Sequence, residues 1–207
     1  SAQKWKKKII LIGTGGHLIS TINLIESLNI YKIVGLVSNS KLKKKILGYS
    51  IIGEDKDLPK IFKNVANNCC IAIGQIKDSQ PRNKIFKKLK KIGFNLPSLI
   101  SRSVYIDKSI KIGEGSIIFH NSILNSNVSI GNNCIINSGV IIEHDTTISE
   151  NCHISTGEII NGSVFIGKNT FIGSGTIIKQ NLKIGNNCVI GMGEKIKRNV
   201  KNNCLIK

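Results

Sequence analysis

The sequence predicts two successive folds: a small Rossmann-like α/β domain over residues 1–100, and a left-handed parallel β-helix of hexapeptide repeats over residues 101–207. Two observations lead to this prediction. Aliphatic residues recur at every sixth position without interruption, and the repeat is established from about Val104 onward. Ahead of them, short apolar runs alternate with helical periodicity around a glycine-rich turn, which is typical of parallel α/β domains.

The period of six is the strongest pattern in the chain. Neither a helix nor an isolated strand explains it, because a helix needs apolar residues every three or four positions and a strand needs simple alternation. A triangular coil of three short strands does explain it, with one aliphatic side chain pointing inward from each strand. Three hexads make one coil, so the repeat predicts about five stacked coils. The sixteen positions are Ile106, Ile112, Ile118, Leu124, Ile130, Ile136, Ile142, Ile148, Ile154, Ile160, Ile166, Ile172, Ile178, Ile184, Ile190 and Ile196.

Small residues accompany the aliphatic ladder. Glycine often follows it, as at Gly113 and Gly131, where we expect a corner that only a small residue turns easily. Three of the six cysteines, Cys134, Cys152 and Cys188, lie at one phase of the repeat, two residues before an aliphatic. No CxxC pair or zinc-site spacing is present. We therefore expect buried, reduced structural thiols and no metal.

The first hundred residues alternate between strand and helix patterns. Strands are predicted over residues 8–12, 32–37 and 70–73, and helices from the glycine turn to about residue 28 and over residues 81–91. The turn reads Gly13-Thr14-Gly15-Gly16-His17 and leads into a helix, whose free N–H groups and dipole favour a phosphate. The dinucleotide fingerprint is incomplete: Leu18 stands at its third glycine, and Ser38 and Asn39, not an acid, follow the second strand. A tight structural turn explains the glycines equally well.

One histidine on the predicted β-helix surface has unusual neighbours in the sequence. His144 lies between Glu143 and Asp145, and a carboxylate beside an imidazole fixes its tautomer and raises its basicity. This arrangement suits a general base, although a solvated histidine with incidental acidic neighbours gives the same pattern. His153 follows nine residues later, half a coil around, and His17 is placed to donate to a phosphate.

Composition excludes some classes of function. The formal charge of +18 does not predict nucleic-acid binding, because lysine occurs throughout the chain, aromatic residues are only 5%, and no nucleic-acid-binding motif is present. Such a surface also suits small polyanions such as coenzyme A or nucleotide sugars. No apolar stretch is long enough for a membrane span, and no secretory signal is apparent. We expect a cytoplasmic protein.

The glycine turn, the hexapeptide ladder and the His144-Asp145 pair together resemble the bacterial sugar acetyltransferases typified by PglD and NeuD. Residues 135–145 and 153–155 are particularly similar, and the resemblance covers nearly the whole chain. It implies a homotrimer with three active sites between adjacent β-helices. Acetyl-CoA is expected along the groove between two helices, and a nucleotide-linked sugar in the N-terminal domain.

The resemblance also implies roles for individual residues. His144 would be the general base, Asp145 would orient it, and Asn137 would lie near the reacting group. The residues expected to contact acetyl-CoA are His153, Gly173 and Gly191. The residues expected to hold the nucleotide sugar are Gly13, Gly15, Gly16, His17, Ser38 and Asn39. Two departures concern the nucleotide: Leu18-Ile19 replaces the usual Gly-Lys, and Ser38-Asn39 replaces an acidic residue.

The favoured hypothesis is direct N-acetylation of an amino-deoxy sugar carried on UDP or dTDP, such as a 4-amino-4,6-dideoxyhexose, for surface glycan synthesis. O-acetylation of a sugar of the sialic-acid type uses the same machinery and is the first alternative. A non-catalytic trimeric binding protein is the second. Nucleic-acid binding, the remaining option, predicts a steep dependence on salt.

Overall fold

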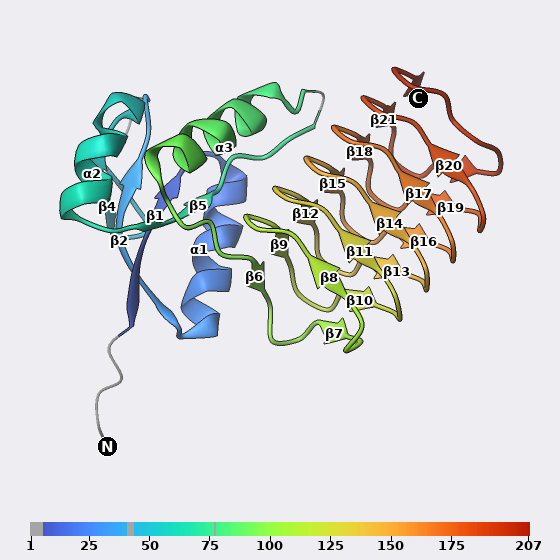
Figure 1. Ribbon diagram of the computed structural model, residues 1–207, viewed down its shortest axis with the longest axis horizontal. Coiled ribbons are helices and arrows are strands. Elements are labelled where there is room, and N and C mark those ends of the chain that lie inside the picture. The colour runs from blue at the N-terminus through green and yellow to red at the C-terminus, as the bar shows by residue number, and fades with distance from the viewer. Residues whose placement is uncertain (1–5, 41–43, 77) are drawn as a thin grey trace. The chain divides into compact units, whose positions relative to one another are not determined.

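The computed structural model describes residues 6–40, 44–76 and 78–207. The chain divides into two compact units. The first consists of Ser1–Gly74 and Lys84–Pro97, and the second of Gln75–Asn83 and Ser98–Lys207, so the chain passes between the units three times. Figure 1 shows a sheet with helices in the first unit and stacked coils in the second.

A five-stranded sheet with the order β3-β4-β2-β1-β5 forms the first unit. Its strands are β1 (Lys7–Ile12), β2 (Tyr31–Val37), β3 (Lys45–Ile46), β4 (Tyr49–Gly53) and β5 (Asn68–Ile71). All neighbours are parallel except the β3–β4 hairpin. Because β1 lies between β2 and β5, the loops after these three strands meet at one edge of the sheet. The sequence pattern predicts these three strands but not the hairpin.

Three helices pack on this sheet: α1 (Gly16–Leu28), α2 (Leu58–Asn64), which follows a short 3₁₀ turn (Asp55–Asp57), and α3 (Gln80–Ile92). Alternate residues of β1, Ile10 and Ile12, pack with Leu58 of α2 and Leu89 of α3 in one apolar cluster. No helix in the described part of the chain is both long and apolar enough to cross a membrane.

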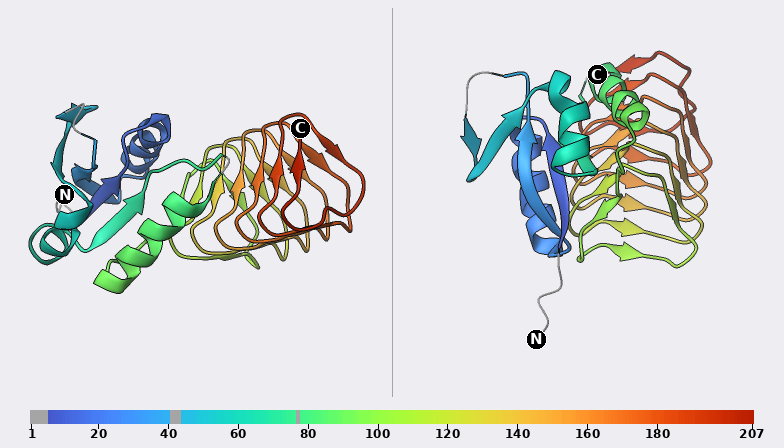
Figure 2. Two further views of the ribbon diagram at one scale, coloured as in Figure 1. Left: turned by 90° about the horizontal axis from the view of Figure 1, so that it is seen from above. Right: turned by 60° about the vertical axis from the view of Figure 1, so that its left-hand side comes forward.

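The second unit is a parallel β-helix with three faces, which confirms the predicted repeat fold (Figures 1 and 2). The six-stranded face contains β7 (Tyr105–Ile106), β10 (Ile123–Leu124), β13 (Ile141–Ile142), β16 (Ile159–Ile160), β19 (Ile177–Ile178) and β22 (Lys195–Ile196). The five-stranded face contains β8 (Lys111–Ile112), β11 (Ser129–Ile130), β14 (Thr147–Ile148), β17 (Phe165–Ile166) and β20 (Lys183–Ile184). The seven-stranded face contains β6 (Leu99–Ile100), β9 (Ile117–Ile118), β12 (Ile135–Ile136), β15 (His153–Ile154), β18 (Phe171–Ile172), β21 (Val189–Ile190) and β23 (Leu205–Ile206).

All sixteen predicted aliphatic residues occupy the second position of a strand, from β7 to β22. From Ile118 to Ile196 none is more than 6% exposed, so they form one continuous core. Strands pair with the strand eighteen residues further on, as Ile142 pairs with Ile160, except that β21 pairs with β23 sixteen residues further on. Two further strands, β6 and β23, lie outside this series of sixteen and extend the seven-stranded face at its two ends.

Three corners connect the faces, and their residues recur every eighteen positions. In one coil the first corner (residues 143–146) leads from the six- to the five-stranded face, the second (149–152) to the seven-stranded face, and the third (155–158) back to the six-stranded face. Three residues after each aliphatic from Ile118 to Ile190 the backbone is left-handed, with φ of +58° at Asp145 and +57° at Asn151. Asn, Asp and Gly accept this conformation most readily, which explains their recurrence.

The glycines directly after the aliphatics have another cause than the one expected. A Cβ on Gly131 would lie 2.5 Å from the backbone nitrogen of Glu150 in the next coil. These glycines allow neighbouring coils to stack closely, and the left-handed turn falls two residues later, at Asn133.

Two positions before most of the aliphatics, a small residue points inward. The thiols and hydroxyls of this inner column donate to carbonyl groups of the next coil, with Cys134 Sγ 3.1 Å from the oxygen of Ser149 and Thr170 Oγ1 2.9 Å from the oxygen of Gly185. Cys134, Cys152 and Cys188 are free and fully buried in this column, as the sequence predicts.

Glu158 occupies the same inner position, where the coils on either side have Val140 and Thr176. Its side chain is completely buried. Oε1 accepts the N–H of Ser155 at 2.7 Å, whereas Oε2 makes no hydrogen bond to any described residue. Burial raises the pKa of Glu158 well above its usual range.

Glu158→Val should therefore stabilise the protein. Removing a buried, half-satisfied carboxyl group should increase the free energy of unfolding at pH 7 by about 1–3 kcal/mol. Because the folded-state pKa is raised, the wild-type group is least unfavourable below the unfolded pKa of about 4.5 and destabilises increasingly as the pH rises. Denaturant unfolding of both proteins at equal concentration, at pH 4 and pH 7, measures the difference. An equal stability gap at the two pH values would contradict this account.

Candidate active site

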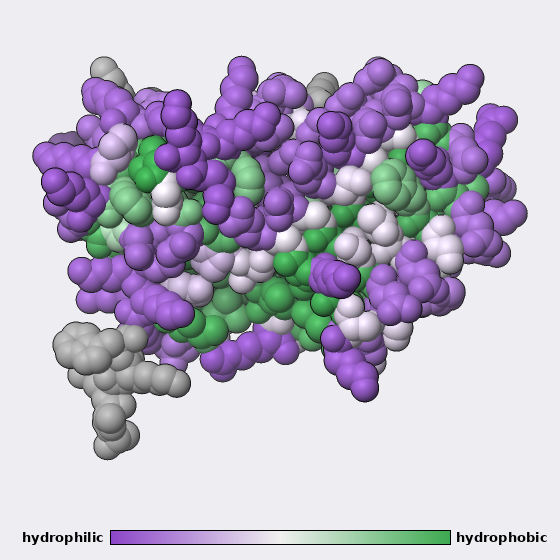
Figure 3. Space-filling view, in the orientation of Figure 1, coloured by the Kyte–Doolittle hydropathy of each residue, from purple (hydrophilic) through white to green (hydrophobic). Residues whose placement is uncertain are grey.

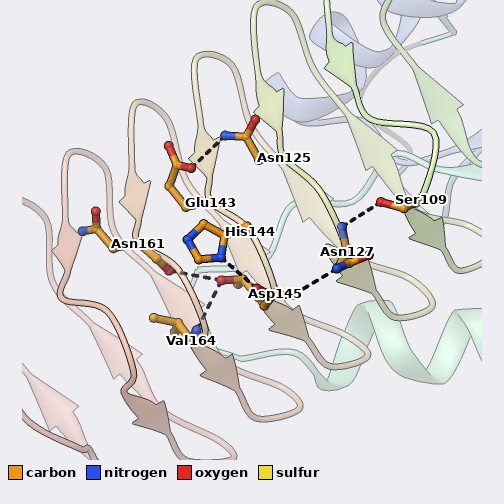
Figure 4. A network of polar contacts seen from close by, with 9 residues as sticks. Ser109, Asn125, Asn127, Glu143, His144, Asp145, Asn161 and Val164 are labelled. Atoms are coloured by element: carbon orange, nitrogen blue, oxygen red, sulfur yellow. Dashed lines mark hydrogen bonds and ion pairs between the residues drawn. The ribbon is translucent and has the colours of Figure 1, made fainter.

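The His144–Asp145 pair lies at the first corner, between β13 and β14. His144 Nδ1 is 2.8 Å from Asp145 Oδ2, and both side chains are more than half exposed (Figure 4). The carboxylate can only accept, so Nδ1 carries a proton, and in the neutral form of the ring the lone pair is on Nε2. The hydrogen bond from His144 lowers the pKa of Asp145, with a further contribution from Asn127. Of the two acidic neighbours in the sequence, Asp145 is the one that contacts the imidazole.

A ladder of polar side chains holds Asp145 in place. Asn127, one coil earlier at the same corner, donates from Nδ2 to Asp145 Oδ1 at 3.1 Å. The N–H of Asn127 donates in turn to Ser109 Oγ at 2.8 Å. Asp145 thus contacts His144 through one oxygen and Asn127 through the other, which orients the imidazole.

Glu143 does not share in the pair, contrary to the sequence-based picture of two carboxylates around one imidazole. Its Oε2 accepts a hydrogen bond from Asn125 Nδ2 at 2.9 Å (Figure 4). Successive residues at a corner point in different directions, so proximity in sequence to His144 does not bring Glu143 to the ring.

Gly162 lies directly beside the imidazole, one coil further on. A Cβ at this position would be 2.7 Å from both Cε1 and Nε2 of His144. Absence of a side chain at Gly162 is therefore a condition for the observed ring position. Gly162 was not among the candidates from the sequence. Its spacing of eighteen residues from His144 is the feature that could have identified it.

His153 lies on the seven-stranded face and is 6% exposed. Its Nδ1 donates to the carbonyl oxygen of Gln75, and its ring packs edge-on against Phe171 with centroids 5.2 Å apart. Burial lowers the pKa of His153 to about 4, so the ring is neutral at physiological pH. Nε2 makes no hydrogen bond to a described residue. The structure thus places His153 on another face from His144 and beneath a connecting segment.

That segment, Gln75–Asn83, is fastened along the second corner. Gln75 Nε2 donates to the carbonyl of Asn151 at 2.9 Å. The fully buried Arg82 donates to the carbonyls of Asn133 and Gly115, each at 3.4 Å. Sequence reasoning missed Gln75 and Arg82, because contacts across 33 to 76 residues leave no local pattern.

Asn137, Gly173 and Gly191 share the third corner, at the opposite edge of the six-stranded face from His144. Asn137 Oδ1 accepts the N–H of Ser138 at 2.9 Å. A Cβ on Gly173 would lie 2.6 Å from the backbone of Gly191, so coil stacking already requires glycine there. Within one chain, therefore, the predicted residues of the β-helix fall at two separate corners and, for His153, on the seven-stranded face.

The predicted nucleotide-sugar residues gather at the carboxyl edge of the small sheet. Gly13 has φ of +138°, and a Cβ there would lie 2.6 Å from the carbonyl oxygen of Ala72. Gly15 and Gly16 instead face open space at the start of α1, and His17 stands in its first turn beside Gly74. The first glycine is thus required by packing, whereas the other two leave the helix N-terminus accessible.

Ser38 and Asn39 follow β2 at the same edge. The N–H of Ser38 donates to the carbonyl of Gly53, and its Oγ accepts the N–H of Ser40 at 3.0 Å. Asn39 Oδ1 accepts the N–H of Asp55 at 3.0 Å, which leaves its amide N–H groups as donors. Both residues shape the loop, and neither carries a carboxylate.

Comparison with known proteins gives matches to both halves. The family model for the PglD N-terminal domain matches residues 8–89, and the bacterial transferase hexapeptide model matches residues 109–144 and 163–193. No curated protein sequence is significantly similar.

Several solved structures are similar over almost the whole chain. PerB from Caulobacter crescentus, in complex with CoA and GDP-perosamine, has a TM-score of 0.89 and 26% identity, covering 96% of this chain and 92% of that one. A histidine-to-asparagine variant of perosamine N-acetyltransferase from the same organism has a TM-score of 0.90 and 25% identity, with the same coverage. The acetyltransferase domain of PglB from Neisseria gonorrhoeae, in complex with acetyl coenzyme A, has a TM-score of 0.88 and 22% identity, covering 97% and 96%.

The fold and the paired histidine and aspartate define a hexapeptide-repeat transferase. The chain therefore carries a domain that matches the PglD N-terminal family model, followed by repeats that match the bacterial transferase hexapeptide model, and over almost its whole length it is similar in structure to sugar N-acetyltransferases with this arrangement.

Gly162→Ala should displace the His144 ring without unfolding the corner. The φ of Gly162 lies outside the left-handed region, so alanine fits the backbone, but its Cβ would occupy the position of the imidazole. Nitrogen NMR of the imidazole should show wild-type His144 protonated at Nδ1 and the variant losing this preference. Thr156→Ala, at the equivalent position of the third corner, is the control. An unchanged His144 spectrum in Gly162→Ala would refute the contact.

Proposed function

We propose that this chain is an acetyl-CoA-dependent N-acetyltransferase whose acceptor is an amino-deoxy sugar linked to a nucleoside diphosphate. The observation that carries the proposal is the His144–Asp145 pair at an exposed corner of the β-helix, in a chain whose two halves match these two family models. Similar structures that bind CoA and GDP-perosamine support the same conclusion.

The proposed chemistry follows from the protonation of the imidazole. Asp145 accepts a hydrogen bond from Nδ1–H, so Nε2 of His144 can take a proton from the sugar amine as the amine nitrogen attacks the thioester carbonyl. The C–N bond forms, the C–S bond breaks, and the leaving CoA thiolate takes the proton from the His144 imidazolium. Alignment of the two substrates can contribute about 7–11 kcal/mol, and the base about 10²–10⁴-fold.

The small domain is proposed to hold the nucleotide. Its open helix N-terminus at Gly15 and Gly16 suits the diphosphate, and Ser38 and Asn39 lie at the same edge of the sheet. The relative with a bound nucleotide sugar carries guanine, whereas UDP or dTDP is expected from the sequence. A panel of nucleotide sugars is therefore needed to identify the nucleobase.

A homotrimer is proposed because the six-stranded face is apolar on its outside. The outward residue is apolar in five consecutive coils: Tyr105, Ile123, Ile141, Ile159 and Ile177. Tyr105 is 57% exposed and Ile177 38% exposed, and apolar surface gathers on the β-helix in Figure 3. An apolar face of this extent marks an interface. Around a threefold axis, the His144 edge of one copy meets the Asn137 edge of the next, which assembles the predicted catalytic residues.

In such a trimer, the third corner offers acetyl-CoA a surface without side chains. Its left-handed positions carry glycine in four successive coils, at Gly139, Gly157, Gly175 and Gly193, each with open space around it. The other two corners use Asn, Asp or Ser in most of the same positions, so the turn itself does not demand glycine. Missing side chains allow an extended ligand to approach the backbone.

We also propose that the reaction takes place in the cytoplasm, for surface glycan synthesis. Six cysteines without a disulfide suit a reducing compartment.

Thiol release from acetyl-CoA with a panel of acceptors tests the function. The panel contains UDP-, dTDP- and GDP-linked 4-amino sugars, the corresponding hydroxy sugars, and a sialic acid. We expect turnover of an amino sugar and about a 10²–10⁴-fold lower kcat for His144→Ala. Asp145→Asn should also lower kcat, but with wild-type stability, because asparagine occupies this left-handed position in other coils. Preference for a hydroxy acceptor would favour O-acetylation, and binding without turnover would favour a non-catalytic protein.

Ile159→Lys should dissociate the trimer, because it places a charge in the middle of the apolar face. Thr147→Lys, at the equivalent outward position of the five-stranded face, should leave the trimer intact. Sedimentation velocity reports the oligomeric state, and acetyl transfer by each variant reports whether the site needs a neighbouring copy. Full activity of a monomeric Ile159→Lys protein would disprove the shared site.

A further inference from the structure

Positive charge is not spread evenly along the chain, contrary to the expectation from the sequence that lysine occurs throughout. Residues 79–106, which contain α3, include seven lysines and arginines and no acidic residue. Residues 112–167 of the β-helix contain five acidic residues and no lysine or arginine. A compositional preference for lysine would act on both segments alike, so it does not explain this contrast.

Four lysines form a stripe along α3, and their spacing of i, i+3, i+4 and i+7 brings them to one side of the helix. The α3 stripe consists of Lys84, Lys87, Lys88 and Lys91. All four residues are exposed, and they extend over about 10 Å of the helix axis. The opposite side of the helix, with Ile85 and Leu89, is buried in the apolar cluster of the small sheet. The stripe therefore faces away from the core.

The neighbouring helix α2 adds two exposed lysines over the same apolar cluster. Lys60 and Lys63 are exposed, whereas Leu58 and Ile61 of the same helix are buried in the cluster that also holds α3. Helix α1, whose buried residues lie outside that cluster, contains no lysine or arginine. The cations of the helices are thus gathered on α2 and α3.

The fold does not require the α3 stripe. Like charges at i and i+4 destabilise a helix, and the stripe contains two such pairs, Lys84 with Lys88 and Lys87 with Lys91. The helix dipole favours cations only in the last turn, which accounts for Lys91 but not for Lys84 or Lys87. Lys88 Nζ donates to the carbonyl oxygen of Asp55 at 2.7 Å, so one lysine of the four has a structural contact.

The acidic turn before α2 does not neutralise the stripe. Glu54 forms a salt bridge with Lys56 at 3.1 Å, and Asp57 Oδ2 accepts the N–H of Glu54 at 2.9 Å. Among the described residues, no carboxylate forms a salt bridge with the four lysines of the stripe. Their charges are therefore available to a partner.

The partner that fits is a broad anionic surface. Exposed lysines that are spread along two helices suit many weak contacts with phosphate groups. An anionic bilayer offers such a surface, and clusters of about four to eight lysines or arginines are known to bind it. Nucleic acid fits less well, because single strands bind through aromatic side chains that stack on bases, and Phe62 and Phe86 are packed against the apolar cluster.

We propose that the α3 stripe, together with Lys60 and Lys63, attaches this protein reversibly to membranes rich in anionic lipid. The contact is electrostatic, between lysine ammonium groups and lipid phosphates. It inserts no helix into the hydrocarbon, because the apolar side of α3 is already buried in the small domain. This surface goes beyond the proposed acetyl transfer and does not depend on it.

Vesicle flotation tests the surface. Wild-type protein is mixed with vesicles of phosphatidylglycerol and phosphatidylcholine, or of phosphatidylcholine alone, at increasing salt. We expect binding to the anionic vesicles only, and release as salt screens the charges. The variant Lys84→Gln/Lys87→Gln/Lys88→Gln/Lys91→Gln should bind at least about 10-fold more weakly. Its melting temperature should be unchanged or higher, because like-charge repulsion within the helix is removed.

A matched variant removes four exposed lysines of the β-helix instead: Lys111→Gln, Lys168→Gln, Lys183→Gln and Lys201→Gln. Its net charge falls by the same amount, but it should bind vesicles like the wild type. Three outcomes overturn the proposal: no binding of the wild type to anionic vesicles, unchanged binding by the α3 variant, or equal weakening by both variants. Binding of a single-stranded RNA instead of anionic vesicles, lost in the α3 variant, would assign the surface to nucleic acid and overturn it as well.

Discussion

The structure of the β-helix depends on a hydrogen-bond register between neighbouring coils. Along the faces, a backbone N–H donates to the carbonyl seventeen residues ahead, as Gly131 does to Ile148, and in the corners to the carbonyl nineteen residues behind, as Asp145 does to Ser126. Because the backbone groups of each coil find their partners in adjacent coils, residues eighteen apart must lie above one another. This constraint converts positions in the sequence into columns in space.

The columns explain why few residue types occupy the inward positions of the β-helix. Inward positions alternate between large aliphatic residues and small residues whose hydroxyl or thiol donates to the next coil, so cysteine, serine and threonine are interchangeable there. Glu158 is too large and too polar for its column, and its second oxygen has no partner in the described chain. Such an exception stands out because the register leaves little freedom at neighbouring positions.

The parts that sequence predicts well are those with local or periodic signals. The ladder from Ile118 to Ile196 is regular, so its burial follows from counting, and His144 with Asp145 are neighbours in the chain. Contacts between distant segments have no such signal, and Gln75 against His153 or Arg82 against Asn133 appear only in three dimensions. Glu143 pairs with Asn125 instead of His144 because corner geometry, not adjacency, decides direction. The β3–β4 hairpin and α2 were missed because their apolar runs are too short to show a period.

The same register has a consequence for how such proteins can change in length. An insertion of six residues would rotate every later residue by one face, so that first-corner residues would arrive at another corner. Within the regular part of the stack, a whole coil of eighteen residues preserves each residue's corner, and each added coil moves the later coils by about 4.8 Å along the axis. A chain of this kind can therefore lengthen or shorten its regular stack only in steps of one coil.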